Sequence, residues 1–167
     1  MNIKKLTTTA ILSALYVVLA LSLKIPMGVG NISLDLGYIV LTIAALNLGA
    51  PAAIVGGLGA LLESMLFSSY GISYGWIVMN VIIGLICGIV LNKMNKKDFT
   101  IKNYIIASII IIASVFIGVA AKTGIECYLY SIPLIVKIPK SLTAFVIDSV
   151  VMIIGLPIGT KIKKIFK

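Results

Sequence analysis

Long stretches without charge are the feature that most limits what this chain can fold into. Residues 74–91 and 103–121 contain no charged side chain, and residues 142–160 contain one. A water-soluble domain would cover its core with charged helix faces, but only 11% of the 167 residues are charged and the mean hydropathy is +1.19. The sequence therefore predicts an all-α polytopic membrane protein, with a single six-transmembrane-helix domain over residues 1–167.

Six membrane spans follow from these apolar stretches, each long enough to cross roughly 25–30 Å at about 1.5 Å per residue. Their expected ranges are 7–23, 33–48, 51–67, 74–91, 103–121 and 142–160. The second and third spans form a hairpin whose arm lengths favour full crossing, although charge does not decide this because both ends lie outside. Residues 122–140 are expected to form the longest outer connection.

Lysine marks the inner side of the membrane. All 14 basic residues are lysines, and ten of them lie near the two ends of the chain or in the segment 92–102. This is the distribution of cytoplasmic loops. It predicts a multi-pass protein of the plasma membrane of a prokaryote, surrounded by lipid, with both termini in the cytoplasm. It also explains the net charge of +9 without a nucleic-acid partner. The first apolar segment is expected to be a retained helix, because equally apolar segments follow it.

Two carboxylic acids interrupt segments that otherwise have the composition of membrane helices. Glu63 lies in the third predicted span and Asp148 in the sixth, in a chain with only five acidic residues. An ionisable side chain at the bilayer centre costs on the order of 3 kcal/mol on insertion scales, so it faces a protein interior, a wet cavity or a polar ligand. We therefore expect Glu63 and Asp148 to take part in function.

Other polar and aromatic residues fall at a similar depth, in the outer half of the membrane. Trp76 and Asn80 are one turn apart in the fourth span, and Lys122 follows the fifth. An aromatic plane, an amide, an amine and carboxylates around an outward-opening cleft suit a small polar heteroaromatic ligand. The predicted ligand-binding residues are Glu63, Tyr74, Trp76, Asn80, Lys122, Glu126 and Asp148. The inner half shows little besides its lysines.

Each of these residues also has a purely structural interpretation. The aromatic residues, Tyr70 and Tyr74 above all, suit an interfacial belt. Asn80 could bond a neighbouring helix. Lys122 and Glu126 could form a solvent-exposed pair, or Lys122 could neutralise Asp148.

No catalytic arrangement is recognisable in the sequence. Histidine is absent, Cys87 and Cys127 fit no metal-ligand spacing, and no nucleophile motif accompanies the carboxylates. We therefore expect no enzymatic activity, no cofactor and no metal.

The first span carries an A-x-x-x-A pattern, Ala10-Ile-Leu-Ser-Ala14, which with Thr7 and Ser13 makes a strip of small residues in its cytoplasmic half. Six short spans, lysine-flanked inner ends and the hairpin LDLGYIVLTIAALNLGAPAAIVGGLGALLESML accompany it. In this combination the chain resembles the S components of energy-coupling factor (ECF) vitamin transporters over nearly its full length. The stretch YGISYGWIVMNVIIGLICGIV is similar to riboflavin-type members.

The resemblance implies a division of labour between subunits. The chain would bind a vitamin in its outer half, under the loop at residues 24–35. It would dock on a transmembrane coupling subunit through Ala10 and Ala14, and two cytoplasmic ATPases would drive a toppling motion. A vitamin B6 form or the hydroxymethyl-pyrimidine precursor of thiamine fits best, because each is a small ring that needs one aromatic stack and several hydrogen bonds. Riboflavin would need a larger aromatic cradle.

Two other classes of function remain open on the sequence. A stand-alone proton- or cation-coupled carrier would use Glu63 and Asp148 as proton sites, but the chain is short and shows no inverted repeat. A structural membrane subunit would bind no ligand at all.

Overall fold

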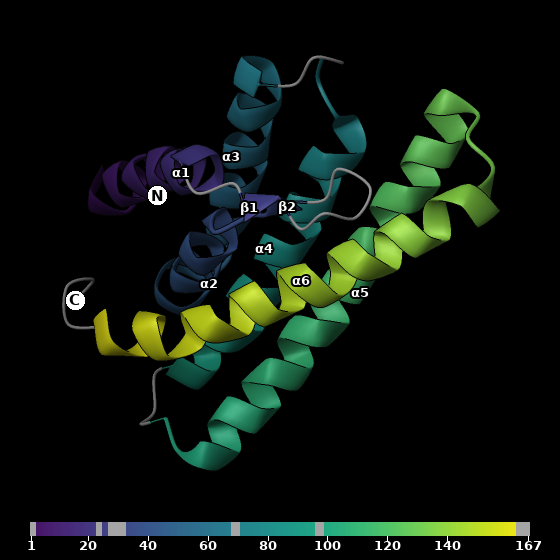
Figure 1. Ribbon diagram of the computed structural model, residues 1–167. Helices are drawn as coiled ribbons and strands as arrows, with labels where there is room; N and C mark the ends of the chain where they lie inside the picture. Colours follow the sequence, from purple (N-terminus) through teal and green to yellow (C-terminus); the bar gives the residue numbers. More distant parts are fainter. Residues whose placement is uncertain (1–2, 23–24, 27–32, 68–70, 96–98, 163–167) are drawn as a thin grey trace.

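Six α-helices make up most of the chain, as the sequence predicts. The computed structural model describes residues 3–22, 25–26, 33–67, 71–95 and 99–162. Its helices are α1 (Ile3–Ser22), α2 (Gly37–Leu48), α3 (Ala52–Phe67), α4 (Tyr74–Asn95), α5 (Ile101–Tyr130) and α6 (Leu134–Lys161) (Figure 1). After α1 comes a short antiparallel pair of strands, β1 (Ile25–Pro26) and β2 (Ser33–Leu34). The predicted six-helix, all-α fold class is confirmed.

Four of the described helices, α1, α4, α5 and α6, are long and apolar enough to cross a membrane. α2 has 12 residues and α3 has 16, which corresponds to about 18 and 24 Å at the helical rise per residue. The hydrocarbon core of a bilayer is about 30 Å thick. The two arms of the predicted hairpin are therefore shorter than the full crossing that we expected from the sequence.

α2 begins four residues later than predicted because Asp35 turns the chain before it. The Gly37 backbone N–H donates to Asp35 Oδ1 at 2.7 Å, an arrangement that aspartate commonly makes in turns and at helix starts. Residues 33–34 pair with β1 and do not extend the helix.

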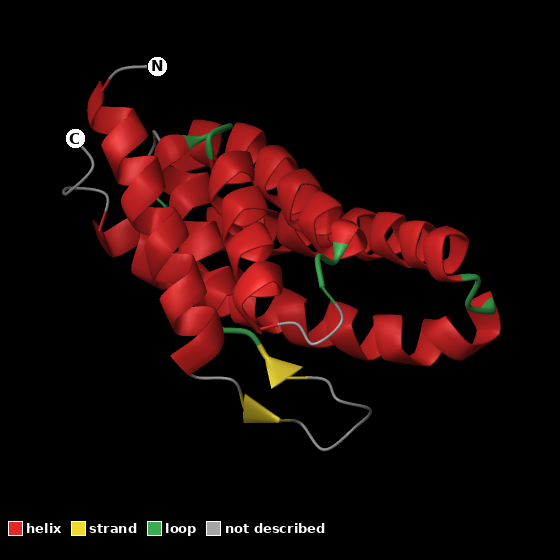
Figure 2. Cartoon of the chain, turned by 90° about the horizontal axis from the view of Figure 1, so that it is seen from above, coloured by secondary structure: helices red, strands yellow, loops and turns green. Residues whose placement is uncertain are grey.

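The outer connection predicted at residues 122–140 is wrong. α5 continues to Tyr130 and α6 begins at Leu134, so only residues 131–133 join them. Ser131 has a φ of 50°, the left-handed conformation that often ends a helix. Figure 1 and Figure 2 show the α5–α6 hairpin extending beyond the other helices. Thr123 and Glu126 of α5 bond Ser141 and Lys137 of α6, and sequence composition alone does not distinguish such contacts from a loop.

Glycines let α4 approach the α2–α3 hairpin closely. A Cβ on Gly84 would lie 2.6 Å from the Ala52 carbonyl oxygen, and a Cβ on Gly88 would lie 2.7 Å from the Gly49 carbonyl carbon. Both neighbours are backbone atoms, so no side-chain rearrangement could make room. The small residues on this face of α4 therefore let its backbone pack directly against the hairpin.

Asparagine side chains connect the helices at the end of the bundle where α2 and α4 finish. Asn92 and Asn95 donate to the Leu46 carbonyl at 2.9 and 3.2 Å, and Asn47 donates to the Gly159 carbonyl of α6 at 3.1 Å. The bonds to Leu46 satisfy a carbonyl that the last turn of α2 leaves without a helical partner. This end of the bundle, which the lysines led us to expect on the inner side, is therefore richer in polar contacts than the sequence indicated.

Candidate functional site

Tyr16 of α1 lies at the centre of the candidate site. Its side chain is fully buried, and its hydroxyl lies 3.2 Å from both Asp35 Oδ2, just before α2, and Asn80 Oδ1 on α4. A Cβ on Gly59 of α3 would collide with the Tyr16 ring, so this glycine makes room for it. A hydroxyl has one hydrogen and donates to one of two such oxygens at a time. Tyr16 thus links α1 to the three helices that follow it.

A row of aromatic rings extends from Tyr16 toward α5. Tyr38 of α2 packs edge-to-face with Tyr16 at a centroid distance of 6.3 Å, and with Trp76 of α4 at 6.1 Å. On α5, Lys122 places its ammonium 4.2 Å from the centre of the Trp76 ring, a cation–π contact. Residues far apart in the sequence thus form one continuous group across the bundle.

Asp148 brings α6 to the same group of side chains. It is 4% exposed, and its charge interacts with Asp35, Glu63 and Lys122. Asp148 Oδ2 and the Tyr38 hydroxyl are both buried and lie close enough to interact with each other, and neither bonds any other described residue. Buried polar groups are nearly always bonded. The pair therefore adds a hydroxyl donor and a carboxyl acceptor to the group that contains Tyr16 and Trp76.

These side chains form one group that we call the outer cluster. Its members are Tyr16, Asp35, Tyr38, Glu63, Trp76, Asn80, Lys122 and Asp148. Five of the seven residues predicted from the sequence as ligand-binding are among them. Glu63 is 8% exposed and acts electrostatically on Tyr16, Tyr38 and Asp148.

The other two predicted residues lie outside the outer cluster. Glu126 is buried and forms an ion pair with Lys137 of α6, with 2.6 Å between the charged atoms, so it is not half of a solvent-exposed pair with Lys122. Tyr74 is 58% exposed, which suits the alternative role in an interfacial belt. Tyr70 and most of the predicted loop at 24–35 fall outside the described residues.

Tyr16, Asp35 and Tyr38 are the cluster members that sequence reasoning did not predict as ligand-binding. The two tyrosines lie within apolar segments, where a tyrosine adds little to the polarity of a window. A usable signal was nevertheless present. A phenolic hydroxyl at membrane depth needs a hydrogen-bond partner, so a tyrosine in the middle of a span points to other polar groups nearby.

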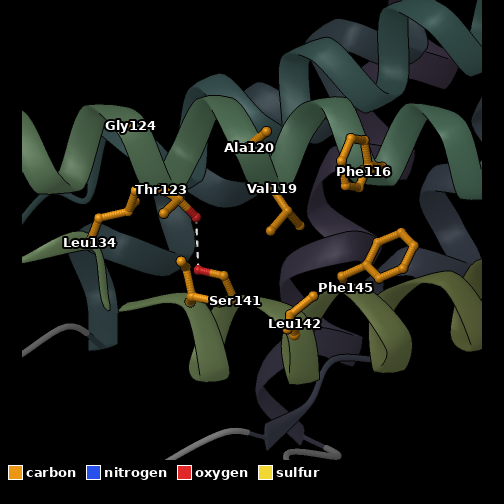
Figure 3. Close-up of a pocket in the computed structure, with 10 residues that line it drawn as sticks. Phe116, Val119, Ala120, Thr123, Gly124, Leu134, Ser141, Leu142 and Phe145 are labelled. Carbon is orange, nitrogen blue, oxygen red and sulfur yellow. Dashed lines mark hydrogen bonds between the residues drawn. The ribbon is translucent and has the colours of Figure 1, made fainter. Parts of the chain in front are cut away.

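A separate cavity of about 300 Å³ lies between α5 and α6 (Figure 3). Its lining is apolar except for Thr123 and Ser141, whose hydroxyls bond each other at 2.7 Å. Phe116 and Phe145 pack edge-to-face at one end, with 5.9 Å between their ring centroids. Because its two hydroxyls already bond each other, the described lining offers little to a ring with several polar groups. We therefore assign the candidate site to the outer cluster.

Comparison with known families decides between the classes of function. The sequence matches the family described as "ECF-type riboflavin transporter, S component" over residues 1–164. The chain belongs to this family. As an S component it is a membrane subunit that binds a vitamin for uptake by an ECF transporter, and the resemblance drawn from the sequence is confirmed. The family is one of transporter subunits and not of enzymes.

A solved structure shares the fold of this S component. It is the crystal structure of the S-component for biotin from an ECF-type ABC transporter, with a TM-score of 0.74 and 19% identity. The likeness covers 97% of this chain and 92% of that one, and at this identity it shows the fold alone. No curated protein matches the chain in sequence.

α1 of this S component presents two different faces. Ala10 and Ala14 are exposed, as an interface with another subunit would require. Ser13 is buried and donates to the Thr9 carbonyl at 2.9 Å. The predicted strip of small residues is therefore wrong at Ser13, which lies about 100° around the helix from Ala14 and faces the bundle.

Proposed function

We propose that the outer cluster is the vitamin site of this S component. The proposal rests above all on the Tyr38 hydroxyl and Asp148 Oδ2, two neighbouring buried polar atoms that bond no other described residue and lie beside the Trp76 ring. The Trp76 ring packs against Tyr38, and Lys122 contacts Trp76 while its charge interacts first with Glu126 and then with Asp148. A small ring bound beside Trp76 would satisfy both atoms and gain an aromatic contact.

The composition of the outer cluster indicates the chemistry of the ligand. Asp35, Glu63 and Asp148 supply carboxylate acceptors, whereas Lys122 is the one cationic member among its described residues. A ligand with ring N–H, amino or hydroxyl donors complements such a site. Vitamin B6 forms and hydroxymethyl-pyrimidine carry these donors on a single small ring, so we infer that one of them is the substrate.

Riboflavin is the second candidate, because the matching family is described by that vitamin. Its fused three-ring system needs a broad flat slot. In the outer cluster, the centre of the Trp76 ring lies 6.1 Å from the centre of the Tyr38 ring and 4.2 Å from the Lys122 ammonium. These close neighbours of Trp76 suit a small ring better than a broad one. Biotin, named for the solved relative, carries a carboxylate that the three acids of the cluster would repel.

Calorimetric titration of the purified full chain tests this assignment. The probes are pyridoxine, pyridoxal, hydroxymethyl-pyrimidine, riboflavin and biotin. We expect tight binding of a B6 form or of the pyrimidine. Binding of riboflavin alone would reject the ligand class while retaining the vitamin-binding role. Binding of a probe that is unaffected by Asn80→Ala and Glu63→Gln would reject the outer cluster as the site.

We also propose that the exposed face of α1 docks on the transmembrane coupling subunit, and that two cytoplasmic ATPases drive transport. Ala10 and Ala14 lie on this face, and small residues let helices approach closely. Their side chains are directed away from the buried face that carries Tyr16. Docking and ligand binding therefore use opposite sides of one helix.

Replacing Ala10 or Ala14 with tryptophan should block transport and spare ligand binding. The bulky ring would hold the coupling subunit away from α1, whereas the outer cluster would not be touched. We expect uptake by the reconstituted complex to fall more than tenfold while ligand affinity changes less than twofold. Ala113→Trp, at an exposed alanine of α5, is the matched control and should leave uptake unchanged. Equal loss of uptake and binding in the α1 variants would contradict the docking assignment.

A further inference from the structure

Tyr16 lies on the buried face of α1, and its contacts bear on the orientation of the exposed face. The helix packs on α2 and α3, and through Tyr16 it also reaches Asn80 of α4. Tyr16 lies two residues after Ala14, which is about 200° around the helix, so the two side chains project from nearly opposite sides. A rigid helix that tilts or rotates moves both together. The contacts of Tyr16 therefore constrain the orientation of the exposed face.

The Tyr16 hydroxyl has two alternative acceptors on two different structural elements. Asp35 Oδ2 lies just before α2 and Asn80 Oδ1 lies on α4, and each is 3.2 Å away, longer than the roughly 2.7–2.8 Å usual for O–H···O bonds. One hydrogen serves one of them at a time. A ligand donor that engages Asn80 would shift the Tyr16 hydrogen to Asp35, and one that engages Asp35 would shift it to Asn80. Two discrete arrangements of this kind are what coupling between sites requires.

We propose that Tyr16 is a positioning residue that transmits occupancy of the outer cluster to the orientation of α1. The proposal rests on the outer cluster being the ligand site. Asp35 also accepts from the Gly37 N–H at 2.7 Å, so a change at Asp35 reaches the first turn of α2. Gly59 confines the ring, which leaves the hydroxyl as the part of the side chain whose bonds can change. Ligand binding would thus fix α1 in one orientation.

Hydrogen–deuterium exchange on the full chain in lipid nanodiscs tests this role. The probe is whichever of pyridoxine, pyridoxal, hydroxymethyl-pyrimidine or riboflavin binds the wild-type chain, added at saturation. In the wild type we expect the probe to slow exchange of α1 amides severalfold. In Tyr16→Phe, which keeps the ring against Gly59, the probe is added at a concentration that saturates the variant, and the slowing in α1 should be lost.

Tyr104→Phe is the matched control. It removes a tyrosine hydroxyl that bonds Thr160 at 2.9 Å between α5 and α6, away from the outer cluster. In Tyr104→Phe, the probe should slow amide exchange in α1 as much as it does in the wild type. For Tyr16→Phe without the probe, amide exchange outside α1 should match that of the wild type, which shows that the variant is folded. The proposal would be overturned if the probe slowed α1 exchange in Tyr16→Phe as much as in the wild type. It would also be overturned if the probe bound the wild-type chain without changing amide exchange in α1. A wild-type chain that binds none of the probes would instead overturn the proposed ligand class, and this coupling with it.

Discussion

Asp148→Asn is expected to weaken vitamin binding by roughly 100-fold. The change keeps the shape of a side chain that is 4% exposed, but it replaces one buried acceptor oxygen with a donor. A buried hydrogen bond left unmade costs on the order of 1–3 kcal/mol, and about 1.4 kcal/mol corresponds to tenfold in affinity. A ligand donor at this position would lose its bond and would face another donor. Calorimetric titration with the ligand of the wild-type chain measures the change.

Two other acids provide controls for this substitution. Asp98→Asn alters an acid that the sequence places in the lysine-rich segment 92–102, so affinity should stay within twofold of the wild type. Glu126→Gln alters an acid that pairs with Lys137, so its effect should be smaller than that of Asp148→Asn. Wild-type affinity in Asp148→Asn would remove α6 from the binding site. An equal loss in Asp98→Asn would mean that overall charge, and not contact, governs binding.

Gly88→Ala is expected to destabilise the fold by about 2 kcal/mol and to lower the Tm by roughly 4–8 °C. A Cβ at this position would lie 2.7 Å from the Gly49 carbonyl carbon, so α4 and the α2–α3 hairpin would have to separate. Alanine favours helix over glycine by up to about 1 kcal/mol, which makes a net loss of stability specific to the close contact. Thermal unfolding of the purified variant, followed by the fluorescence of Trp76, gives the measurement.

Gly124→Ala is the matched control, since Gly124 is also helical and a Cβ there would meet nothing within 4 Å. Its Tm should equal or exceed that of the wild type. If Gly88→Ala melts at the wild-type temperature, the close packing of α4 on Gly49 does not hold in the membrane.

The sequence predicted the helix count and much of the outer cluster because both depend on how a residue differs from its neighbours in the sequence. Charged and polar side chains are rare in apolar spans, so Glu63, Asn80 and Asp148 were visible against their surroundings. The topology from the lysines then placed them at a common depth, which brought residues of α3, α4 and α6 together without any knowledge of contacts.

The rest of the site depends on contacts between elements. Tyr16 joins the outer cluster because Gly59 of α3 leaves space for its ring and because Asp35 and Asn80 reach it from two other segments. The length of the α5–α6 hairpin has a similar origin. The ion pair between Glu126 and Lys137 and the bond between their neighbours Thr123 and Ser141 join the two helices where the sequence suggested a loop. Such pairs join residues of different helices, so a short stretch of sequence does not reveal them.

The α5–α6 hairpin has a consequence for how the protein sits in its bilayer. α5 has 30 residues and is about 45 Å long, against a hydrocarbon core of about 30 Å. The tip of the hairpin exposes apolar and aromatic side chains, Tyr128, Ile135 and Val136 among them, so its projection into water is unfavourable. Such hydrophobic mismatch is relieved by tilting, and a thinner bilayer demands more tilt. Because α5 carries Lys122 and α6 carries Asp148, the acyl-chain length of the surrounding lipid bears directly on the geometry of the outer cluster.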